Sequence, residues 1–314
     1  MELQIAQTAF RTDIIKGLSS PQKFLLPKYF YNTEGDRIFQ QIMQAPEYYI
    51  TNAEDEILDC QSDEILKTSM QLFPTFDIVE LGAGDATKTI HLLQEAVRLG
   101  ASDHYYPIDI SRNTIDYLHT ALPSLVPGMQ ITGLEGEYIP MLQQVPLTKP
   151  KLVLFLGANI GNMLPDEALA FCKRILNKGD MLLTGFDLKK DPQKILAAYN
   201  DKAGFTKAFN LNLLVRINDE LGADFNTAHF THYPLYDPVT GACKSYLISR
   251  IKQQVTLDDG TTFRFEKDEP VYMEVSQKYS EREIDKMAIQ AGFKTIRSFY
   301  DSNHLFVDTL WQKK

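Results

Sequence analysis

The sequence predicts an α/β protein, in which a doubly wound parallel sheet is joined to a second unit of mixed helices and strands. Short apolar segments alternate with amphipathic ones between residues 76 and 188, the pattern of parallel strands connected by helices. The last segment, from Glu281, contains one helix and two strands that we expect to return to this sheet. Between these two parts the alternation stops, and residues 189–276 predict two helices followed by hairpin strands.

Composition and charge restrict the class of protein. The 314 residues allow one large α/β domain or two modest ones. The net charge of −9 argues against a nucleic-acid-binding surface, which would need clustered Lys and Arg. We therefore expect no nucleic acid as partner. No apolar stretch is long enough to span a bilayer, so we expect no membrane as partner either. We expect instead a small-molecule substrate, and a monomer or weak homo-oligomer.

Cysteine and histidine usage favours neither disulfides nor a metal. Cys60, Cys172 and Cys243 are far apart and odd in number, without the spacing of a disulfide framework or a metal site. The six histidines also lack metal-ligand spacing, so we expect no metal. The N-terminal segment has no apolar core of a secretory signal. These features together predict a cytoplasmic protein.

The first elements are helices. Residues 34–44 predict a helix with Ile38, Phe39 and Ile42 on one face. A second helix is expected over residues 52–66, with Asn52 as its N-cap.

The sheet region follows in regular order. Each apolar strand is followed by a polar loop or a helix, and Gly100 supplies a C-terminal cap for the first of these helices. The expected strands cover residues 76–82, 105–111, 129–138, 150–162 and 179–188, and the expected helices 86–100, 111–122 and 165–176.

The remaining segments complete the two units. An Asp-Gly turn at Asp259 and Gly260 predicts a hairpin in the middle of the chain. The final helix is expected to end at Gly292, before the last two strands. Asp187 and Asp191 flank two lysines at the junction, and we interpret them as helix-start and surface residues.

A glycine loop follows the first strand in the stretch ELGAGDATKT. Gly82 and Gly84 allow the backbone to approach a ligand closely, as ligands in open parallel sheets bind beyond the carboxyl ends of the strands. A dinucleotide fingerprint would need a third glycine where the chain has Thr87. Alone, the loop fits an ordinary strand-to-helix turn equally well.

Acidic residues end the next two strands. Asp109 can bind both hydroxyls of a ribose, and Glu137 with Tyr138 can hold an adenine ring. Such acids without a basic phosphate-binding cluster suit S-adenosylmethionine (SAM), with Lys88 as partner of its methionine carboxylate. The alternatives are that Asp109 caps a helix and that Glu137 and Lys88 are merely exposed.

Longer motifs carry a family resemblance. The stretch KYFYNTEGDRIFQQIMQAPEYYITNAEDEIL, followed in order by ELGAGDATKT, PIDIS, FLGANIGN, NDELGADF and EVSQKYS, resembles the histidine-specific, SAM-dependent methyltransferases. That family includes the ergothioneine-pathway enzyme that trimethylates the histidine α-amine to the betaine hercynine. The resemblance implies a Rossmann-like methyltransferase domain (residues 56–188 and 277–314) and an α+β substrate-binding domain (1–55 and 189–276), with the amino acid bound between them.

The resemblance also implies site residues. For SAM it indicates Gly82, Lys88, Asp109, Glu137 and Tyr138, although the family usually has Asp and Phe at the last two positions. Tyr31 is implied as the residue that orients the amine. The implied substrate residues are Tyr48, Gly157, Asn162, Tyr199, Glu274 and Ser276.

The residue types agree with an amino-acid site. Asn162 and Tyr199 are neutral donors for a carboxylate, and Glu274 and Ser276, two apart in a strand, point the same way toward two imidazole nitrogens. Spacing alone would favour an exposed strand face for the latter pair. Where the family often places Met against the substrate ring, this chain supplies Leu247.

Three other functions are weighed against histidine methylation. The first is methylation of another amino acid or related amine, which would share the cofactor site. The second is a non-catalytic SAM-binding module, which need not keep a complete substrate pocket. The third is a nicotinamide dehydrogenase, against which Thr87 and the absence of an evident catalytic dyad count.

Overall fold

The computed structural model describes the backbone of residues 2–314 and the side chains of residues 8–314. The chain divides into two compact units, each described by itself below. The sheet unit comprises Tyr49–Lys190 and Gln277–Lys314, and the second unit Met1–Tyr48 and Asp191–Ser276. The sequence placed the first boundary after residue 55, but helix α3 (Tyr49–Met70) is continuous, so residues 49–55 belong with the sheet.

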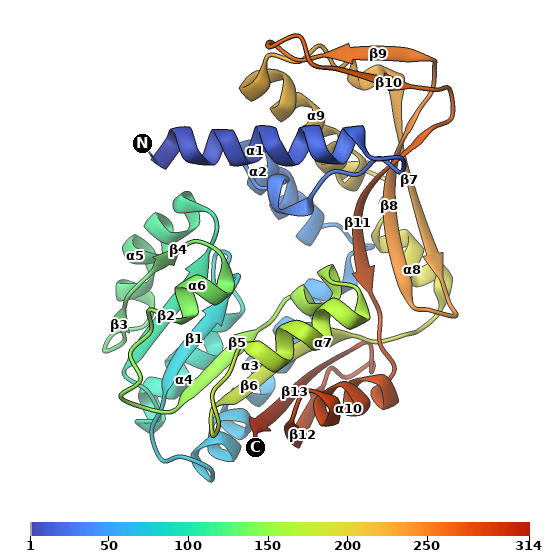
Figure 1. The fold of residues 1–314 in the computed structure, drawn as a ribbon. Coiled ribbons are helices and arrows are strands. Elements are labelled where there is room, and N and C mark those ends of the chain that lie inside the picture. Colours follow the sequence, from blue (N-terminus) through green and yellow to red (C-terminus); the bar gives the residue numbers. More distant parts are fainter. Residues whose placement is uncertain (1) are drawn as a thin grey trace. The chain divides into compact units, whose positions relative to one another are not determined.

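The sheet unit is built on one mixed sheet, shown in Figure 1. Its strand order is β12-β13-β6-β5-β1-β2-β3, with β4 also paired to β2. The strands from β1 to β6 pair in parallel, as the alternation predicted, whereas β13 is antiparallel to both β6 and β12. The strands are β1 (Asp77–Leu81), β2 (His104–Asp109), β3 (Gln130–Ile131), β4 (Leu134–Glu135), β5 (Lys151–Phe155), β6 (Met181–Asp187), β12 (Phe293–Tyr300) and β13 (Phe306–Lys313).

Helices cover both faces of this sheet. An apolar cluster joins α6, α7 and α10 to the strands on one face, and α3 packs with α4 on the other (Figure 1). Gly100 ends α4 in a left-handed conformation (φ 67°), as expected from the sequence. The bounds are α4 (Thr89–Leu99), α5 (Arg112–Leu125), α6 (Tyr138–Leu142), α7 (Pro165–Arg174) and α10 (Glu281–Gln290).

Three sequence expectations for this unit are wrong in detail. The strand expected over 129–138 is broken into β3 and β4, because the chain turns at Thr132 and Gly133 before α6 begins at Tyr138. Asn52 is not an N-cap, because the buried residues Tyr49 and Ile50 already belong to α3. Asp187 is not at the surface but 1% exposed.

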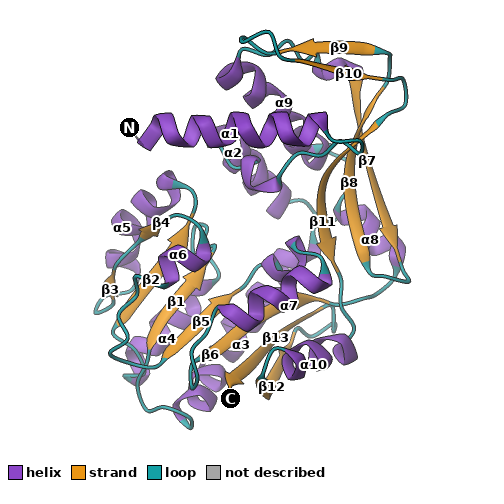
Figure 2. Cartoon of the chain, viewed as in Figure 1, coloured by secondary structure: helices purple, strands orange, loops and turns teal. Residues whose placement is uncertain are grey.

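The second unit combines helices with two small sheets (Figure 2). Its apolar cluster contains Ile38 and Ile42 of α2, and Phe39 packs against it, as the helical periodicity predicted. Strands β11, β8 and β7 form one sheet, and β9 pairs with β10 across the Asp259-Gly260 turn. The bounds are α1 (Glu2–Ser19), α2 (Thr33–Met43), α8 (Pro192–Ala198), α9 (Phe205–Leu221), β7 (Phe230–Asp237), β8 (Ala242–Ser249), β9 (Gln253–Thr256), β10 (Thr262–Phe265) and β11 (Pro270–Gln277).

None of the helices in the described part of the chain has the length and apolar character that crossing a bilayer requires.

Candidate active site

The loops after β1, β2 and β5 meet at one edge of the sheet unit. These strands are parallel neighbours, and the strand order reverses beside β1 because β2 and β5 pair with opposite sides of it. Ligands of open parallel sheets bind at such a reversal, beyond the carboxyl ends of the strands. Of the five residues predicted to bind the cofactor, Asp109 ends β2, and the others lie in or just after the loops that follow β1 and β4.

The glycine loop after β1 leaves space for a ligand. Gly82 has a φ of 76°, and a Cβ there would stand 2.9 Å from Tyr138 Oη and 2.9 Å from Asn159 Nδ2. Gly84 has a φ of 55°, and the position of its absent Cβ is open: apart from its chain neighbours, no described heavy atom lies within 4 Å. The first glycine therefore permits close packing of three loops, and the second presents bare backbone.

Asp109 connects the glycine loop to the start of α5. Its Oδ2 accepts from the Gly84 N–H at 3.1 Å, and its Oδ1 accepts from the Ser111 N–H at 2.9 Å. Burial raises the pKa of the Asp109 carboxyl, although these N–H groups oppose that shift. The side chain is thus part of the loop's architecture as well as a predicted ligand.

Glu137 and Tyr138 stand at the start of α6. Glu137 is exposed at the N-cap position, whereas the half-buried Tyr138 ring packs edge-on against Phe155 of β5, with centroids 5.6 Å apart. Tyr138 Oη reaches Gly82, so the aromatic ring closes one side of the glycine loop.

Lys88 is engaged by a buried carboxylate. Its Nζ forms an ion pair with Glu54 of α3, whose side chain is 0% exposed. Burial works to lower the pKa of the Lys88 amine, but the charge and hydrogen bond of Glu54 outweigh it, so the pKa is raised. Glu54 also accepts from the Gly157 N–H at 2.7 and 2.9 Å, and therefore ties α3 to the loops after β1 and β5.

Two further acids surround this ion pair. Glu80 of β1 is fully buried and accepts from the hydroxyls of Thr89 and Tyr105. Burial raises the pKa of Glu80 to about 7, against the opposing effect of these hydrogen bonds and of Lys88. Burial and the negative charge of Glu54 raise the pKa of Asp308 well above its ordinary value, against the opposing charge of Lys88.

The motif FLGANIGN forms a strained turn after β5. Gly157 and Ala158 both have positive φ, at 71° and 55°. Gly161 packs directly on the chain at Gln277, where an added Cβ would stand 2.8 Å from the carbonyl oxygen. Asn162 ends this turn and is exposed.

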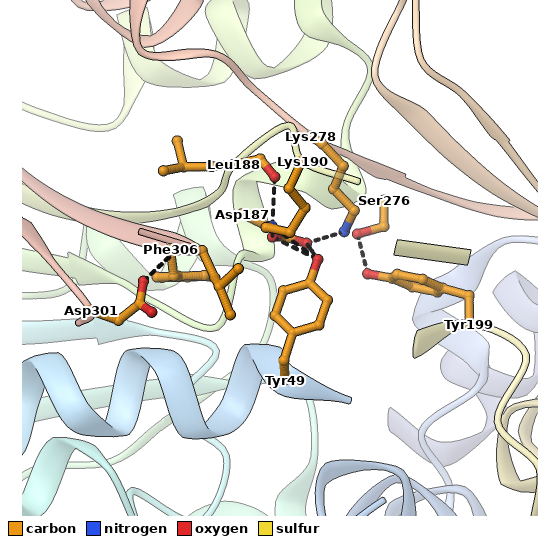
Figure 3. A network of polar contacts seen from close by, with 10 residues as sticks. Tyr49, Asp187, Leu188, Lys190, Tyr199, Ser276, Lys278, Asp301 and Phe306 are labelled. Carbon is orange, nitrogen blue, oxygen red and sulfur yellow. Dashed lines mark hydrogen bonds and ion pairs between the residues drawn. The ribbon is translucent and has the colours of Figure 1, made fainter. Parts of the chain in front are cut away.

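The other predicted substrate residues lie in the second unit. Tyr199 Oη donates to Ser276 Oγ at 2.6 Å, a bond drawn in Figure 3. The Tyr48 ring meets the Tyr199 ring edge-on, with centroids 6.3 Å apart. Glu274 lies two residues before Ser276 in β11, on the side opposite to the buried residues Met273 and Val275.

Tyr31 and Leu247 pack against apolar residues of the second unit. The Tyr31 ring packs edge-on against Phe39 and Phe209, with centroids 5.8 and 5.6 Å apart. Leu247, expected against the substrate ring, is 0% exposed within the apolar cluster of the second unit. That expectation is wrong, because alternation along β8 directs Leu247 into the core.

A family model described as histidine-specific, SAM-dependent methyltransferase matches residues 10–313. The chain belongs to this family. It is 33% identical to a histidine N-alpha-methyltransferase of Mycobacterium tuberculosis, over 93% of this chain and 91% of that protein. It is 27% identical to ergothioneine biosynthesis protein 1 of Schizosaccharomyces pombe (86% of this chain, 36% of that protein) and to an L-tryptophan methyltransferase of Psilocybe serbica (93% and 89%).

Sequence reasoning missed two residues of this methyltransferase's sheet unit. Glu54 supports both loops, and its signal was a carboxylate on the apolar stripe of α3, between Ile50 and Ile57. Asn159 places its amide nitrogen beside both Gly82 and Gly157, at 2.9 and 3.7 Å from their Cβ positions. The only sequence signal for Asn159 was its position between the two glycines of FLGANIGN.

Glu80 makes the stability of the enzyme pH-dependent. Its folded pKa of about 7 lies above the ordinary 4.5, so its stabilising contribution is complete below pH 4.5 and is lost as the pH rises through 7. The difference corresponds to about 3 kcal/mol. We expect Glu80→Gln to be more stable than the parent at pH 8 and close to it at pH 4.5, measured by urea unfolding.

Asp219→Asn, at an exposed position of α9, is the control for loss of a carboxylate. It should follow the parent across the whole pH range. A constant difference between Glu80→Gln and the parent at both pH values would contradict the assignment.

Proposed function

We propose that this chain transfers methyl groups from SAM to the α-amine of histidine, with the trimethylated betaine hercynine as product. The pair Glu274 and Ser276 carries the proposal, because a carboxylate and a hydroxyl on one strand face match the two nitrogens of an imidazole. Membership of the histidine-specific family and the similarity to a histidine N-alpha-methyltransferase support it.

The residues of the glycine loop suit the cofactor of this family. The open backbone at Gly84 and the close packing at Gly82 form a cradle that larger residues would fill. Asp109 would hold the ribose, Glu137 and Tyr138 the adenine, and Lys88 the methionine carboxylate. When bound, SAM supplies an electrophilic methyl group on its sulfonium.

Ser276 and Glu274 would select the substrate ring together. Because Tyr199 donates into Ser276 Oγ, the serine hydroxyl can direct its own proton to an unprotonated ring nitrogen. Glu274 accepts from the other nitrogen. An amino acid without a ring N–H would leave this carboxylate unpaired, which disfavours it strongly.

The aromatic residues act on the amine in this proposal. Tyr31 would orient the amine, which is mostly protonated at neutral pH because an α-amine has a pKa of about 8. One proton must therefore leave before each transfer, and water accepts it. The faces of Tyr31 and Tyr48 would stabilise the growing positive charge by cation–π attraction.

Methylation of another aromatic amino acid is the second candidate, because one relative is named an L-tryptophan methyltransferase. An indole N–H can also donate to Glu274, but an indole offers no acceptor to Ser276. The serine therefore favours histidine over tryptophan.

Product analysis separates these candidates. Purified protein is incubated with SAM and a mixture of the common amino acids, and the products are examined by mass spectrometry. We expect histidine alone to gain methyl groups, up to three. Methylation of tryptophan would support the second candidate. Binding of SAM without any methylated amino acid would contradict both and favour a binding module.

Asp109 should govern cofactor affinity. Loss of a charged hydrogen-bond acceptor costs about 1.5–3 kcal/mol, so Asp109→Asn should weaken S-adenosylhomocysteine binding by about tenfold to a hundredfold. Isothermal calorimetry measures the affinity. Asp103→Asn, just before the opposite end of β2, is the control and should bind as the parent does. Equal affinities in the two variants would remove Asp109 from the cofactor site.

Glu274 should govern the choice of amino acid. We expect Glu274→Gln to lower kcat/KM for histidine by at least about a hundredfold, because the amide offers the ring N–H no charged acceptor. Affinity for S-adenosylhomocysteine should stay unchanged. Glu266→Gln, an exposed residue after β10, is the matched control. Parental kinetics in Glu274→Gln would refute the pocket assignment.

A further inference from the structure

A buried ion cluster is centred on Asp187, at the end of β6. Figure 3 shows Tyr49, Lys190 and Lys278 directed at its carboxylate. Tyr49 Oη donates to both carboxylate oxygens at 3.0 Å, and Lys278 Nζ lies 2.6 Å from Oδ2. Lys190 Nζ pairs with Oδ1. The side chains of Asp187 and Lys278 are both 0% exposed, so water does not compensate their charges.

The three partners of Asp187 stand where the chain enters or leaves the sheet unit. The chain first enters this unit at Tyr49 and leaves it after Lys190. It enters again at Gln277, the residue before Lys278. One carboxylate therefore binds a residue at each of the three crossings.

The cluster depends on Asp187 for its charge balance. Two lysines share this one carboxylate, so its removal leaves two buried cations together. Burial lowers the pKa of the Lys190 amine although the charge of Asp187 opposes the shift, and Lys278 lowers it further. The Lys190 ammonium also lies over the Tyr49 ring, 4.4 Å from its centroid, and donates to the Leu188 carbonyl at 2.6 Å.

The chain segments that start at these crossings carry the predicted amino-acid ligands. Tyr48 directly precedes Tyr49, and Ser276 is two residues before Lys278. Tyr199 follows Lys190 by way of α8. Each of the three partners of Asp187 is thus near, along the chain, to one residue of the group Tyr48, Tyr199 and Ser276.

We propose that Asp187 is a positioning residue for the amino-acid substrate, which it never needs to touch. By holding Tyr49, Lys190 and Lys278 at one point, it fixes the starting points of the segments that bear Tyr48, Tyr199 and Ser276. The inference rests on the proposed function. It predicts that weakening the cluster impairs binding of the amino acid, while the predicted cofactor residues, at the end of β2 and after β1 and β4, are unaffected.

Steady-state kinetics with Tyr49→Phe and Asp187→Asn test this inference. Tyr49→Phe removes only one hydroxyl and should fold, and we expect its KM for histidine to rise about threefold, in line with loss of one hydrogen bond to a charged group. Asp187→Asn should raise KM by at least about tenfold, because it removes the carboxylate with which Lys190 and Lys278 both pair. For both variants, kcat and S-adenosylhomocysteine affinity should stay within about twofold of the parent, whereas general unfolding would lower them together with histidine binding.

Lys189→Met is the matched control. It removes the charge next to Lys190, but the ion pair that it breaks is the one between Lys189 and Glu283. The inference would be overturned if Tyr49→Phe had the same KM for histidine as the parent, or if it lost affinity for S-adenosylhomocysteine to the same extent. If Asp187→Asn fails to fold, the result with Tyr49→Phe alone tests the inference. If the parent methylates histidine and the variants have the same KM as the parent, the inference is overturned but the proposed function stands. A parent that methylates no amino acid overturns the proposed function and the inference with it.

Discussion

The buried carboxylate of Glu54 is the interaction on which the ligand-facing edge of the sheet unit depends. It joins α3 to Lys88 after β1 and to the Gly157 N–H after β5, so one side chain sets the positions of two loops. Gly185 of β6 provides the room, because an added Cβ there would stand 2.4 Å from Glu54 Oε1. Without Glu54, Lys88 would lose its ion-pair partner, and both loops would lose their common attachment to α3.

Burial, followed by the charge of this carboxylate, raises the pKa values of two neighbouring acids. Glu54, Glu80 and Asp308 are all buried near a single lysine, and three negative charges there would repel one another. Lys88 balances Glu54, while the pKa of Asp308 is raised by burial and by the charge of Glu54. Glu54 and Asp187 thus share one arrangement, in which a buried carboxylate is paired with lysine.

The sequence predicted the parts of this fold that local pattern determines. The apolar runs of β1, β2, β5 and β6, and Gly100 at the end of α4, were recognisable because alternation and a left-handed cap are properties of a few adjacent residues. The parts that depend on distant partners were not. Leu247 was assigned to the substrate although β8 turns it inward, and Asp187 was placed at the surface although Lys278, far along the chain, neutralises it.

The candidate site shows the same division. The glycine loop and Asp109 could be located because the ends of parallel strands are predictable from order alone. Glu54 and Asn159 could not, since their roles arise only when α3 and the loop after β5 are folded against Gly82 and Gly157.

Backbone strain marks these loops as well. Ala86 and Ala158 both have a φ of 55°, a conformation that costs a residue with a Cβ about 1–2 kcal/mol. Such strain persists only where the surrounding contacts hold it, and both alanines lie in the loops after β1 and β5 that Glu54 joins. The contacts of one buried carboxylate therefore both shape the loops and keep them in a conformation that the chain alone would not adopt.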